Sequence, residues 1–289
     1  MENLLSPLKT VFREVNGHRM HAIDDGAGDP VVMLHGNPSW CYYYRNLALS
    51  LKDSRRVLAP DHIGMGMSDK PGDDRYEYTL SRRVSDLDRF LEVSGVKDRI
   101  TLVVHDWGGM IGMAWAVCNP DRVAKIVVLN TGAFRLPPAK KLPVQLKLAR
   151  TPLGSLLIRG FNAFAKGTAD MGCTCKPMSP EVRAAYLAPY NSWNNRIATL
   201  RFVQDIPLKP SDRAWPCVLA TEHALPVLKD KPMLIAWGEK DYVFDSHFLK
   251  EWLERFPSAR LERFPDCSHY ILEDARDEVI PLIKDFILK

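Results

Sequence analysis

One aspartate lies where a side chain is well placed to react. Asp106 belongs to residues 102–109, where an apolar segment that predicts a strand runs into a turn with Gly108 and Gly109 and then into a predicted helix. Such a strand–turn–helix unit, a nucleophile elbow, exposes one side chain at the end of a sheet. Val104 occupies a position that is usually small in this motif. In an alternative interpretation, Asp106 only caps the helix.

Two further residues follow predicted strands later in the chain. Asp241 comes after the predicted strand 233–236, and His269 comes after the strand-like segment 260–264. Where an elbow supplies the nucleophile, the acid and then the base follow it in the sequence. We therefore expect Asp106 to be the nucleophile, His269 the base, and Asp241 the acid that orients the base.

An aspartate nucleophile limits the chemistry of such a site. A carboxylate is already ionised at neutral pH, so it attacks without the help of a base. Attack on an ester carbonyl would give a high-energy anhydride, whereas attack on an sp³ carbon gives a stable alkyl ester. The expected electrophile is therefore an alkyl carbon with a leaving group, as in alkyl halides, epoxides and strained lactones. The turn His-Gly-Asn-Pro at 35–38 follows a predicted strand, where a backbone amide stabilises developing negative charge.

Short apolar segments alternate with helical ones along much of the chain. The expected strands are 31–34, 56–59, 100–104, 124–129 and 233–236. Continuous apolar strands are typical of a parallel sheet that is covered on both faces. Residues 80–91 have helical spacing, with Thr79 as a cap and Gly95 after the end, and further helices are expected at 110–117, 247–256 and 274–288. This alternation predicts an α/β fold with a mainly parallel, twisted sheet flanked by helices.

Residues 134–215 interrupt this alternation. They contain no convincing strand, and prolines such as Pro143, Pro152 and Pro180 divide them into short predicted helices. The strand pattern resumes at residue 233, so one sheet continues across the interruption. We expect residues 1–133 and 216–289 to form the two parts of a main domain. Residues 134–215 are expected to form a helical cap over the carboxyl ends of the strands, where α/β sheets bind ligands.

The overall composition excludes several classes of protein. The 289 residues are 46% hydrophobic and 26% charged, which is typical of a globular chain. The net charge of +4 is too small to predict nucleic acid as a partner. The longest uncharged segment, 30–44, is shorter than the roughly 20 residues of a membrane span. The first residues lack the features of a secretion signal. We expect no transmembrane segment and a cytoplasmic location.

The cysteines predict neither disulfides nor a metal. Six cysteines over this length are too sparse for a disulfide framework, so reduced thiols are expected. Cys173 and Cys175 form the one close pair, but no histidine or second pair lies nearby in the sequence to complete a zinc site. We expect no metal and no cofactor.

Together, these motifs resemble those of the haloalkane dehalogenase family of α/β-hydrolases. The resemblance covers essentially the whole chain and depends on aspartate rather than serine at the elbow, on Trp107 directly after it, and on Asn37 in His-Gly-Asn-Pro. It implies an α/β-hydrolase fold with an inserted helical cap. It also implies that the Trp107 indole N–H and the Asn37 amide hold the leaving group. One branch of the family has glutamate after the sixth strand as its acid, but here that region is Leu-Asn-Thr-Gly at 129–132, which leaves Asp241.

Asn37 combined with Asp241 resembles the third subgroup of the family. Residues 36–46 and 61–71 are similar to those of the β-lactone decarboxylases of bacterial long-chain olefin biosynthesis. This resemblance implies decarboxylation of a long-chain cis-β-lactone to an alkene and CO₂. The same residues serve haloalkane hydrolysis, so the conversion of 1-haloalkanes to alcohol and halide is the alternative. The part that His269 plays in decarboxylation is left open.

Two other functions are retained as alternatives. Epoxide hydrolases share the aspartate elbow and use tyrosines of the cap, for which Tyr186 and Tyr190 are the candidates, although Pro189 between them disturbs the helix and both can simply pack the cap. A non-catalytic protein with a hydrolase fold would only bind its ligand. The presence of all three expected catalytic residues favours an enzyme.

The expected partner is a small hydrophobic substrate. Association with other enzymes of olefin biosynthesis, or between copies of the chain, stays open. The basic and apolar segment 140–159 suggests contact with a membrane or with an enzyme that handles greasy substrates. The alternative is an ordinary solvated helix face.

Overall fold

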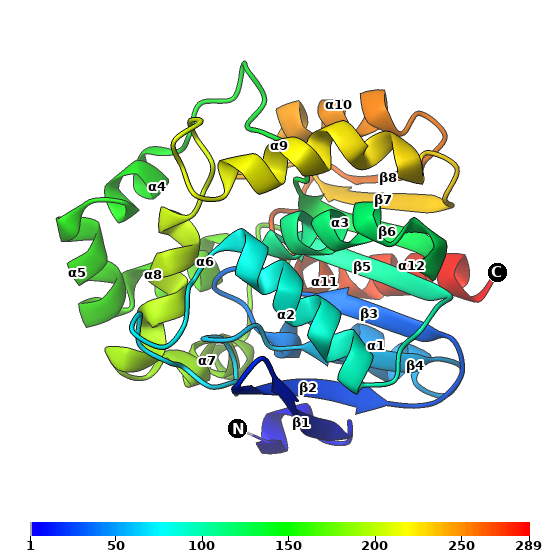
Figure 1. Cartoon of the computed structure of the whole chain (residues 1–289), viewed down its shortest axis with the longest axis horizontal. Helices are drawn as coiled ribbons and strands as arrows, with labels where there is room; N and C mark the ends of the chain where they lie inside the picture. The colour runs from blue at the N-terminus through cyan, green and yellow to red at the C-terminus, as the bar shows by residue number, and fades with distance from the viewer. Residues whose placement is uncertain (1) are drawn as a thin grey trace.

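The computed structural model describes residues 2–289, with side chains from residue 3 onward. Its centre is an eight-stranded sheet with the strand order β1-β2-β4-β3-β5-β6-β7-β8 (Figure 1). Strands β3 to β8 are parallel, and β2 is antiparallel to both of its neighbours. The strands are β1 (Thr10–Val15), β2 (His18–Asp25), β3 (Pro30–Leu34), β4 (Arg56–Pro60), β5 (Ile100–Asp106), β6 (Val123–Thr131), β7 (Met233–Gly238) and β8 (Arg260–Phe264).

The predicted strands form the parallel part of the sheet. Every residue of β5 and of β7 is buried, as expected for strands covered on both faces. The antiparallel hairpin of β1 and β2 was not among the predictions. Its turn is made by Asn16 and Gly17, whose φ angles of 49° and 86° suit the Asn-Gly turn of a two-residue hairpin. Strand β1 is mostly half-buried and so lacks the continuous apolar pattern of the others.

Helices cover both faces of the sheet. One apolar layer joins the sheet to α2 (Leu80–Val93), α3 (Trp107–Cys118), α9 (Trp215–Ala224) and α10 (Ser246–Arg255), and the other joins it to α1 (Arg45–Leu51) and α12 (Arg276–Leu288). The predicted cap of α2 is confirmed, because the Thr79 side chain accepts a hydrogen bond from the Arg82 backbone N–H. The sheet and these helices follow the α/β pattern that the sequence predicts.

The predicted helix 274–288 differs from the observed one. A short helix, α11 (Ile271–Asp274), ends at Asp274, and α12 begins after Ala275, whose φ of −120° is not helical. The Asp274 carboxylate accepts hydrogen bonds at 2.7 Å from the backbone N–H groups of Cys175 and Lys176, and these contacts fix the chain at this point. Pro281 lies inside α12.

The segment between β6 and β7 is helical. Figure 1 shows α4 to α8 grouped on the left, beyond one end of the sheet. Pro152 and Pro180 occupy the first turns of α5 and α7, whose caps are Thr151 and Ser179, so these prolines mark helix starts. The helices are α4 (Val144–Ala149), α5 (Pro152–Phe161), α6 (Ala163–Met171), α7 (Pro180–Leu187) and α8 (Ile197–Gln204). The division at residues 134 and 215 stays a prediction.

Short 3₁₀ turns complete the secondary structure. They are η1 (Glu2–Leu5), η2 (Cys41–Tyr44), η3 (Pro120–Arg122), η4 (Ala188–Tyr190), η5 (Asn194–Arg196) and η6 (Leu225–Leu228). Among residues 2–289, none of the helices has the length and apolar composition needed to cross a membrane.

Candidate active site

Asp106 lies in a strained turn at the end of β5. Its φ of 50° is unusual for a residue with a side chain, and its carboxylate makes no capping hydrogen bond to α3. The capping alternative therefore does not describe this residue. Neighbouring glycines allow the close approach: a Cβ at Gly108 would lie 1.9 Å from the Leu34 carbonyl oxygen, and one at Gly36 would lie 1.9 Å from Asp106 Oδ1. The turn thus directs the Asp106 carboxylate into a cavity.

Backbone amides hold the Asp106 carboxylate in place. The Asn37 backbone N–H donates to Asp106 Oδ1 at 2.6 Å. Burial raises the pKa of Asp106 to about 6, against the lowering effects of His269 and of the backbone N–H groups of Asn37 and Trp107. At pH 7, above this pKa, the Asp106 carboxylate is mainly ionised. The carboxylate is therefore poorly solvated yet charged, which favours nucleophilic attack.

His269 and Asp241 form a buried pair beside Asp106. His269 Nδ1 lies 2.8 Å from Asp241 Oδ2, and His269 Nε2 faces Asp106 Oδ2 at 4.0 Å. Burial disfavours the charged imidazole, but the Asp241 carboxylate outweighs it and the pKa of His269 is raised. The structure thus brings together three residues that lie far apart in the sequence.

Asp241 is held by the backbone and by Asn130. Its Oδ1 accepts hydrogen bonds from the backbone N–H groups of Val243 and Phe244, at 2.8 and 3.1 Å. Its Oδ2 accepts one from Asn130 Nδ2 at 3.1 Å. The Asn130 side chain also exchanges two hydrogen bonds with the Gly238 backbone, at 2.8 and 2.9 Å. Asn130 therefore joins the end of β6 to the loop that carries Asp241.

The sequence analysis did not identify the contribution of Asn130. Residues 129–132 were considered only because they lack a glutamate. The available signal was an asparagine at the end of a predicted strand. A buried side-chain amide at such a position requires hydrogen-bond partners. The partners themselves lie 108 residues away, at Gly238, and 111 residues away, at Asp241.

Asn37 contacts both Asp106 and the helical segment. Its side-chain Nδ2 donates to the Thr199 carbonyl oxygen in α8 at 3.0 Å. Its Oδ1 is buried and has no hydrogen-bond partner within residues 2–289. The loop that carries Asn37 is anchored by Asp61, whose Oδ1 accepts a hydrogen bond from the Cys41 backbone N–H at 2.7 Å. Unpaired buried polar atoms are rare, and this one lies at the wall of the cavity.

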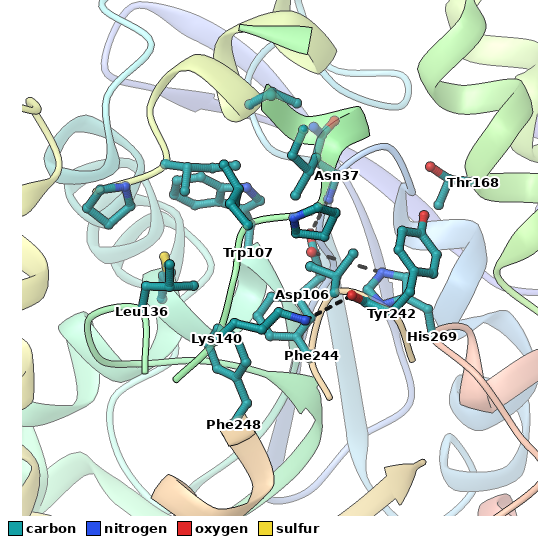
Figure 2. A pocket seen from close by; sticks show the side chains of 18 of the residues that line it. Asn37, Asp106, Trp107, Leu136, Lys140, Thr168, Tyr242, Phe244, Phe248 and His269 are labelled. Atoms are coloured by element: carbon teal, nitrogen blue, oxygen red, sulfur yellow. Dashed lines mark hydrogen bonds and ion pairs between the residues drawn. The ribbon is translucent and has the colours of Figure 1, made fainter. Parts of the chain in front are cut away.

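Trp107 begins α3 directly after the elbow. Its indole packs on Phe202 of α8, with 5.2 Å between the ring centroids, and lines the cavity. Figure 2 shows Trp107 and Asn37 on one side of Asp106 and His269 on the other. Four of the five residues expected from the sequence therefore line a single cavity, and the fifth, Asp241, lies behind His269.

The cavity itself is mostly apolar. Its empty space amounts to about 860 Å³, including the part that is open to solvent. Apolar walls come from α4, α6 and α10 and from the loops after β6 and β7; examples are Phe134, Leu146, Phe164 and Phe248. Such a cavity suits a ligand with alkyl chains.

Two polar residues of the cavity were not identified from the sequence. Lys140 lines it and donates hydrogen bonds to the Tyr242 carbonyl oxygen at 2.9 Å and to Asp245 Oδ2 at 2.8 Å. Tyr242 also lines the cavity, and burial raises the pKa of its phenol to about 12. The positions of both residues depend on contacts between the helical segment and the loop after β7. Contacts between such distant segments produce no local sequence pattern.

The two tyrosines considered for epoxide chemistry lie elsewhere. The Tyr186 hydroxyl donates to Glu273 Oε1 at 2.8 Å, and the Tyr190 hydroxyl donates to the Ser39 carbonyl oxygen at 3.0 Å. Neither is among the residues that line the cavity around Asp106. Both are buried in the packing, so neither is placed to act as an acid on a ligand there.

Two clusters contain side chains of the types that bind metals. They are His21, Cys41 and Asp61, and Cys175, Cys267 and Asp274. The Asp61 carboxylate already accepts hydrogen bonds from His21 and from two backbone N–H groups. The Asp274 carboxylate accepts several more from the backbone of 174–176 and of 268. Both carboxylates therefore have structural partners, and both clusters lie outside the set of residues that line the cavity.

Comparisons with known proteins agree with this geometry. Residues 29–275 match the α/β hydrolase fold family. The chain is 54% identical over 288 residues to a cis-3-alkyl-4-alkyloxetan-2-one decarboxylase of Shewanella oneidensis, which covers 99% of this chain and 91% of that protein. It is 31% identical over 283 residues to haloalkane dehalogenase 2 of Mycobacterium tuberculosis, which covers 96% and 95% of the two chains.

The fold comparison gives the same result. The crystal structure of haloalkane dehalogenase DatA from Agrobacterium tumefaciens superposes with a TM-score of 0.86 at 24% identity, over 99% of this chain and 98% of the other. The chain therefore belongs to the α/β-hydrolase fold family and, within it, to the group of enzymes that includes the haloalkane dehalogenases and the cis-3-alkyl-4-alkyloxetan-2-one decarboxylases.

Proposed function

We propose that this enzyme decarboxylates a cis-3,4-dialkyl β-lactone with long alkyl chains to an alkene and CO₂. The observation that carries the proposal is the buried, charged Asp106 carboxylate at the wall of an apolar cavity. The 54% identity to a protein named for this reaction supports the choice of substrate class. An ionised carboxylate needs no base for its attack, and an apolar cavity suits two alkyl chains.

In the first step, Asp106 attacks the ring carbon that is bonded to the ring oxygen. A bond forms between an Asp106 oxygen and this sp³ carbon, while the bond from that carbon to the ring oxygen breaks. The ring opens to an alkyl ester of Asp106 whose neighbouring carbon bears a carboxylate. The indole N–H of Trp107 and the side-chain amide of Asn37 stabilise this new carboxylate, in the manner of oxyanion-hole donors.

In the second step, the carboxylate leaves as CO₂. The electron pair of the broken carbon–carbon bond forms the alkene, and the ester bond to Asp106 breaks with its electrons returning to the Asp106 carboxylate. This step needs no water and no proton. His269 Nε2 faces Asp106 Oδ2 at 4.0 Å, so a protonated imidazole there stabilises the returning negative charge. The raised pKa of His269 favours this charged form.

Haloalkane hydrolysis is the second candidate. It is favoured by the 31% identity to a haloalkane dehalogenase and by the presence of two donors beside the nucleophile. In that reaction Asp106 would displace the halide, and a neutral His269, oriented by Asp241, would deprotonate the water that cleaves the ester. The two reactions thus require opposite protonation states of His269 in their second steps.

A direct product assay separates the two candidates. The purified enzyme is incubated in parallel with a long-chain cis-3,4-dialkyl β-lactone and with 1-bromohexane, and the products are identified by gas chromatography. The proposal predicts rapid formation of alkene, with slow or absent release of bromide. Hexanol and bromide without alkene would assign the enzyme to haloalkane hydrolysis. The Asp106→Asn variant is the control for activity that does not depend on this site.

A further inference from the structure

The outer face of α4, α5 and α6 exposes an unusual share of large apolar side chains. Eleven such side chains are exposed among residues 3–289, and six of them lie on these three helices: Val144, Leu148, Leu153, Leu156, Phe161 and Met171. Val144 is 70% exposed and Phe161 is 63% exposed. Helix α5 packs on both α4 and α6, and α4 and α5 lie at the left-hand edge of the molecule (Figure 1). A concentration of this kind indicates an interaction surface.

The same face is positively charged. Residues 139–169 contain six lysines and arginines and no aspartate or glutamate, although the whole chain has a net charge of only +4. Asp245 and Asp212 neutralise Lys140 and Arg150. Lys141, Lys147 and Lys166 are exposed, so they leave an excess of positive charge on this face.

Aromatic and basic side chains also meet at its margin. Trp193 is 46% exposed, and the Arg159 guanidinium lies 4.6 Å from its ring centroid. Arg159 Nε donates to the Trp193 carbonyl oxygen at 3.2 Å, which holds Trp193 beside α5. Tryptophan and basic residues around an apolar surface are typical of proteins that bind at the boundary between water and lipid.

A groove on this face adjoins the active-site cavity. It lies between α4, α5 and α6, and Leu148, Leu157 and Met171 are among its mostly apolar lining residues. Leu146, Phe164, Thr168 and Tyr242 line both this groove and the cavity that contains Asp106. In Figure 2, Thr168 and Tyr242 lie side by side, with the Tyr242 hydroxyl directed toward Thr168. These two side chains therefore stand at the junction of the groove and the cavity.

We propose that the outer face of α4–α6 binds the surface of a lipid bilayer with anionic headgroups, and that the groove passes alkyl substrate and product between the bilayer and the cavity. The exposed lysines pair with lipid phosphates, while the apolar side chains enter the boundary between headgroups and acyl chains. The transfer of substrate rests on the proposed function. The binding of lipid does not.

Charge argues against a second copy as the occupant of this face. In a twofold dimer through α4–α6, the exposed Lys141, Lys147 and Lys166 of one copy would approach those of the other, and like charges across an interface are unfavourable. An anionic bilayer complements these charges. The open groove also fits a lipid surface, because alkyl chains can enter it without crossing water.

Vesicle sedimentation tests the proposal without any substrate. The probes are vesicles of phosphatidylglycerol mixed equally with phosphatidylcholine, and vesicles of phosphatidylcholine alone. The full-length protein is expected to sediment with the anionic vesicles at about 50 mM NaCl and to be released at about 500 mM, because salt screens charges at a surface. Binding to neutral vesicles is expected to be much weaker. Failure to bind anionic vesicles would overturn the proposal.

A set of lysine variants tests the assigned face. The triple variant Lys141→Gln, Lys147→Gln and Lys166→Gln should bind anionic vesicles about 100-fold more weakly. Each basic residue near such a surface strengthens binding about fivefold. These side chains are exposed, so the variant is expected to fold.

The matched control removes three exposed lysines from other surfaces. Lys97→Gln, Lys229→Gln and Lys250→Gln change the net charge equally and should alter vesicle binding by less than about threefold. An equal loss of affinity in the control would show that net charge alone is responsible, and would overturn the assignment of the face.

A variant with fewer apolar side chains on this face distinguishes a lipid occupant from a protein occupant. Leu153→Ser, Leu156→Ser and Phe161→Ser combined should weaken binding to anionic vesicles at about 50 mM NaCl, because fewer apolar side chains enter the lipid boundary. If this variant instead converts an oligomer to a monomer in gel filtration and leaves vesicle binding unchanged, the face belongs to a second copy and the proposal is wrong. All variants should convert a short, water-soluble β-lactone at the rate of the unchanged protein, so failure of lipid binding and failure of the proposed activity give different results.

Discussion

Asn130 Nδ2 donates a hydrogen bond to Asp241 Oδ2 across 3.1 Å, and both residues are fully or almost fully buried. The same Asp241 oxygen lies 2.8 Å from His269 Nδ1. Asn130 therefore supports the acid in the orientation that holds the histidine. Because Asn130 also pairs with the Gly238 backbone, one side chain couples the sheet to the loop that carries Asp241.

Replacement of Asn130 should affect both activity and stability. Asn130→Ala removes a donor to Asp241 and leaves the Gly238 N–H without the Asn130 acceptor, which costs about 1–3 kcal/mol of stability. The Gly238 C=O keeps only its longer hydrogen bond, at 3.4 Å, from the Asp241 backbone N–H. We expect a lower melting temperature and a kcat reduced by about tenfold. Thermal unfolding and steady-state alkene formation measure the two effects. Asn119→Ala, a matched change at the end of α3, should retain kcat; an Asn130→Ala variant with full activity would contradict the role of Asn130.

Asp106→Asn should abolish turnover and increase stability. Folding raises the pKa of Asp106 from 3.8 to about 6. Protonation of Asp106 therefore stabilises the folded state below about pH 4, and this stabilisation is lost as the pH rises to 6. Above pH 6, the buried charge costs roughly 3 kcal/mol, which the neutral amide avoids. We expect the variant to unfold at higher denaturant than the unchanged protein at pH 8, with a smaller difference at pH 5. The exposed Asp121→Asn change is the control and should alter neither property.

The pH dependence of alkene formation should be bell-shaped. Below about pH 6 the rate falls because Asp106 becomes protonated and can no longer attack. At high pH it falls again, because the raised pKa of His269 is passed and the imidazolium that stabilises the returning carboxylate is lost. His269→Gln should lower the rate and remove the high-pH limb while the low-pH limb remains. A rate that instead rises to a plateau at high pH would indicate that neutral His269 acts as a base.

Trp107→Phe should lower kcat while preserving the fold. The phenyl ring keeps the packing on Phe202 but lacks the N–H that holds the new carboxylate. Loss of one such donor typically reduces kcat by about 100-fold. Steady-state kinetics on the β-lactone measure the effect. Trp115→Phe, which removes an indole N–H that donates to Asp88 at 2.9 Å on another side of α3, should leave kcat unchanged; equal losses in both variants would point to packing alone.

Local patterns predicted most of the sheet and the positions of the candidate site residues. The parallel strands are continuous apolar segments, and the cap at Thr79 is a local signal for α2. Asp106, Asp241 and His269 were found because each follows the end of a predicted strand within five residues, and parallel strands end at the same edge of a sheet. Their catalytic roles are still proposals that the variants above test.

The remaining features depend on contacts between distant segments. The hydrogen bonds of Asn130 and the burial of Lys140 in the cavity join parts of the chain about 100 residues apart, and no short pattern encodes them. The hairpin at Asn16 and Gly17 had a local turn signal, but a half-buried edge strand lacks the apolar pattern that identified the others. The break at Ala275 follows from the partners of the Asp274 carboxylate in a distant loop.

The central claim is that Asp106 attacks an sp³ carbon and forms an alkyl ester. The most direct measurement is rapid acid quenching of the His269→Ala variant with excess cis-3,4-dialkyl β-lactone, followed by peptide mass spectrometry. The account predicts that the peptide containing Asp106 gains the mass of one lactone, in an ester that survives neutral hydroxylamine. An adduct that hydroxylamine cleaves as an anhydride, an adduct on another residue, or no adduct at all would contradict it.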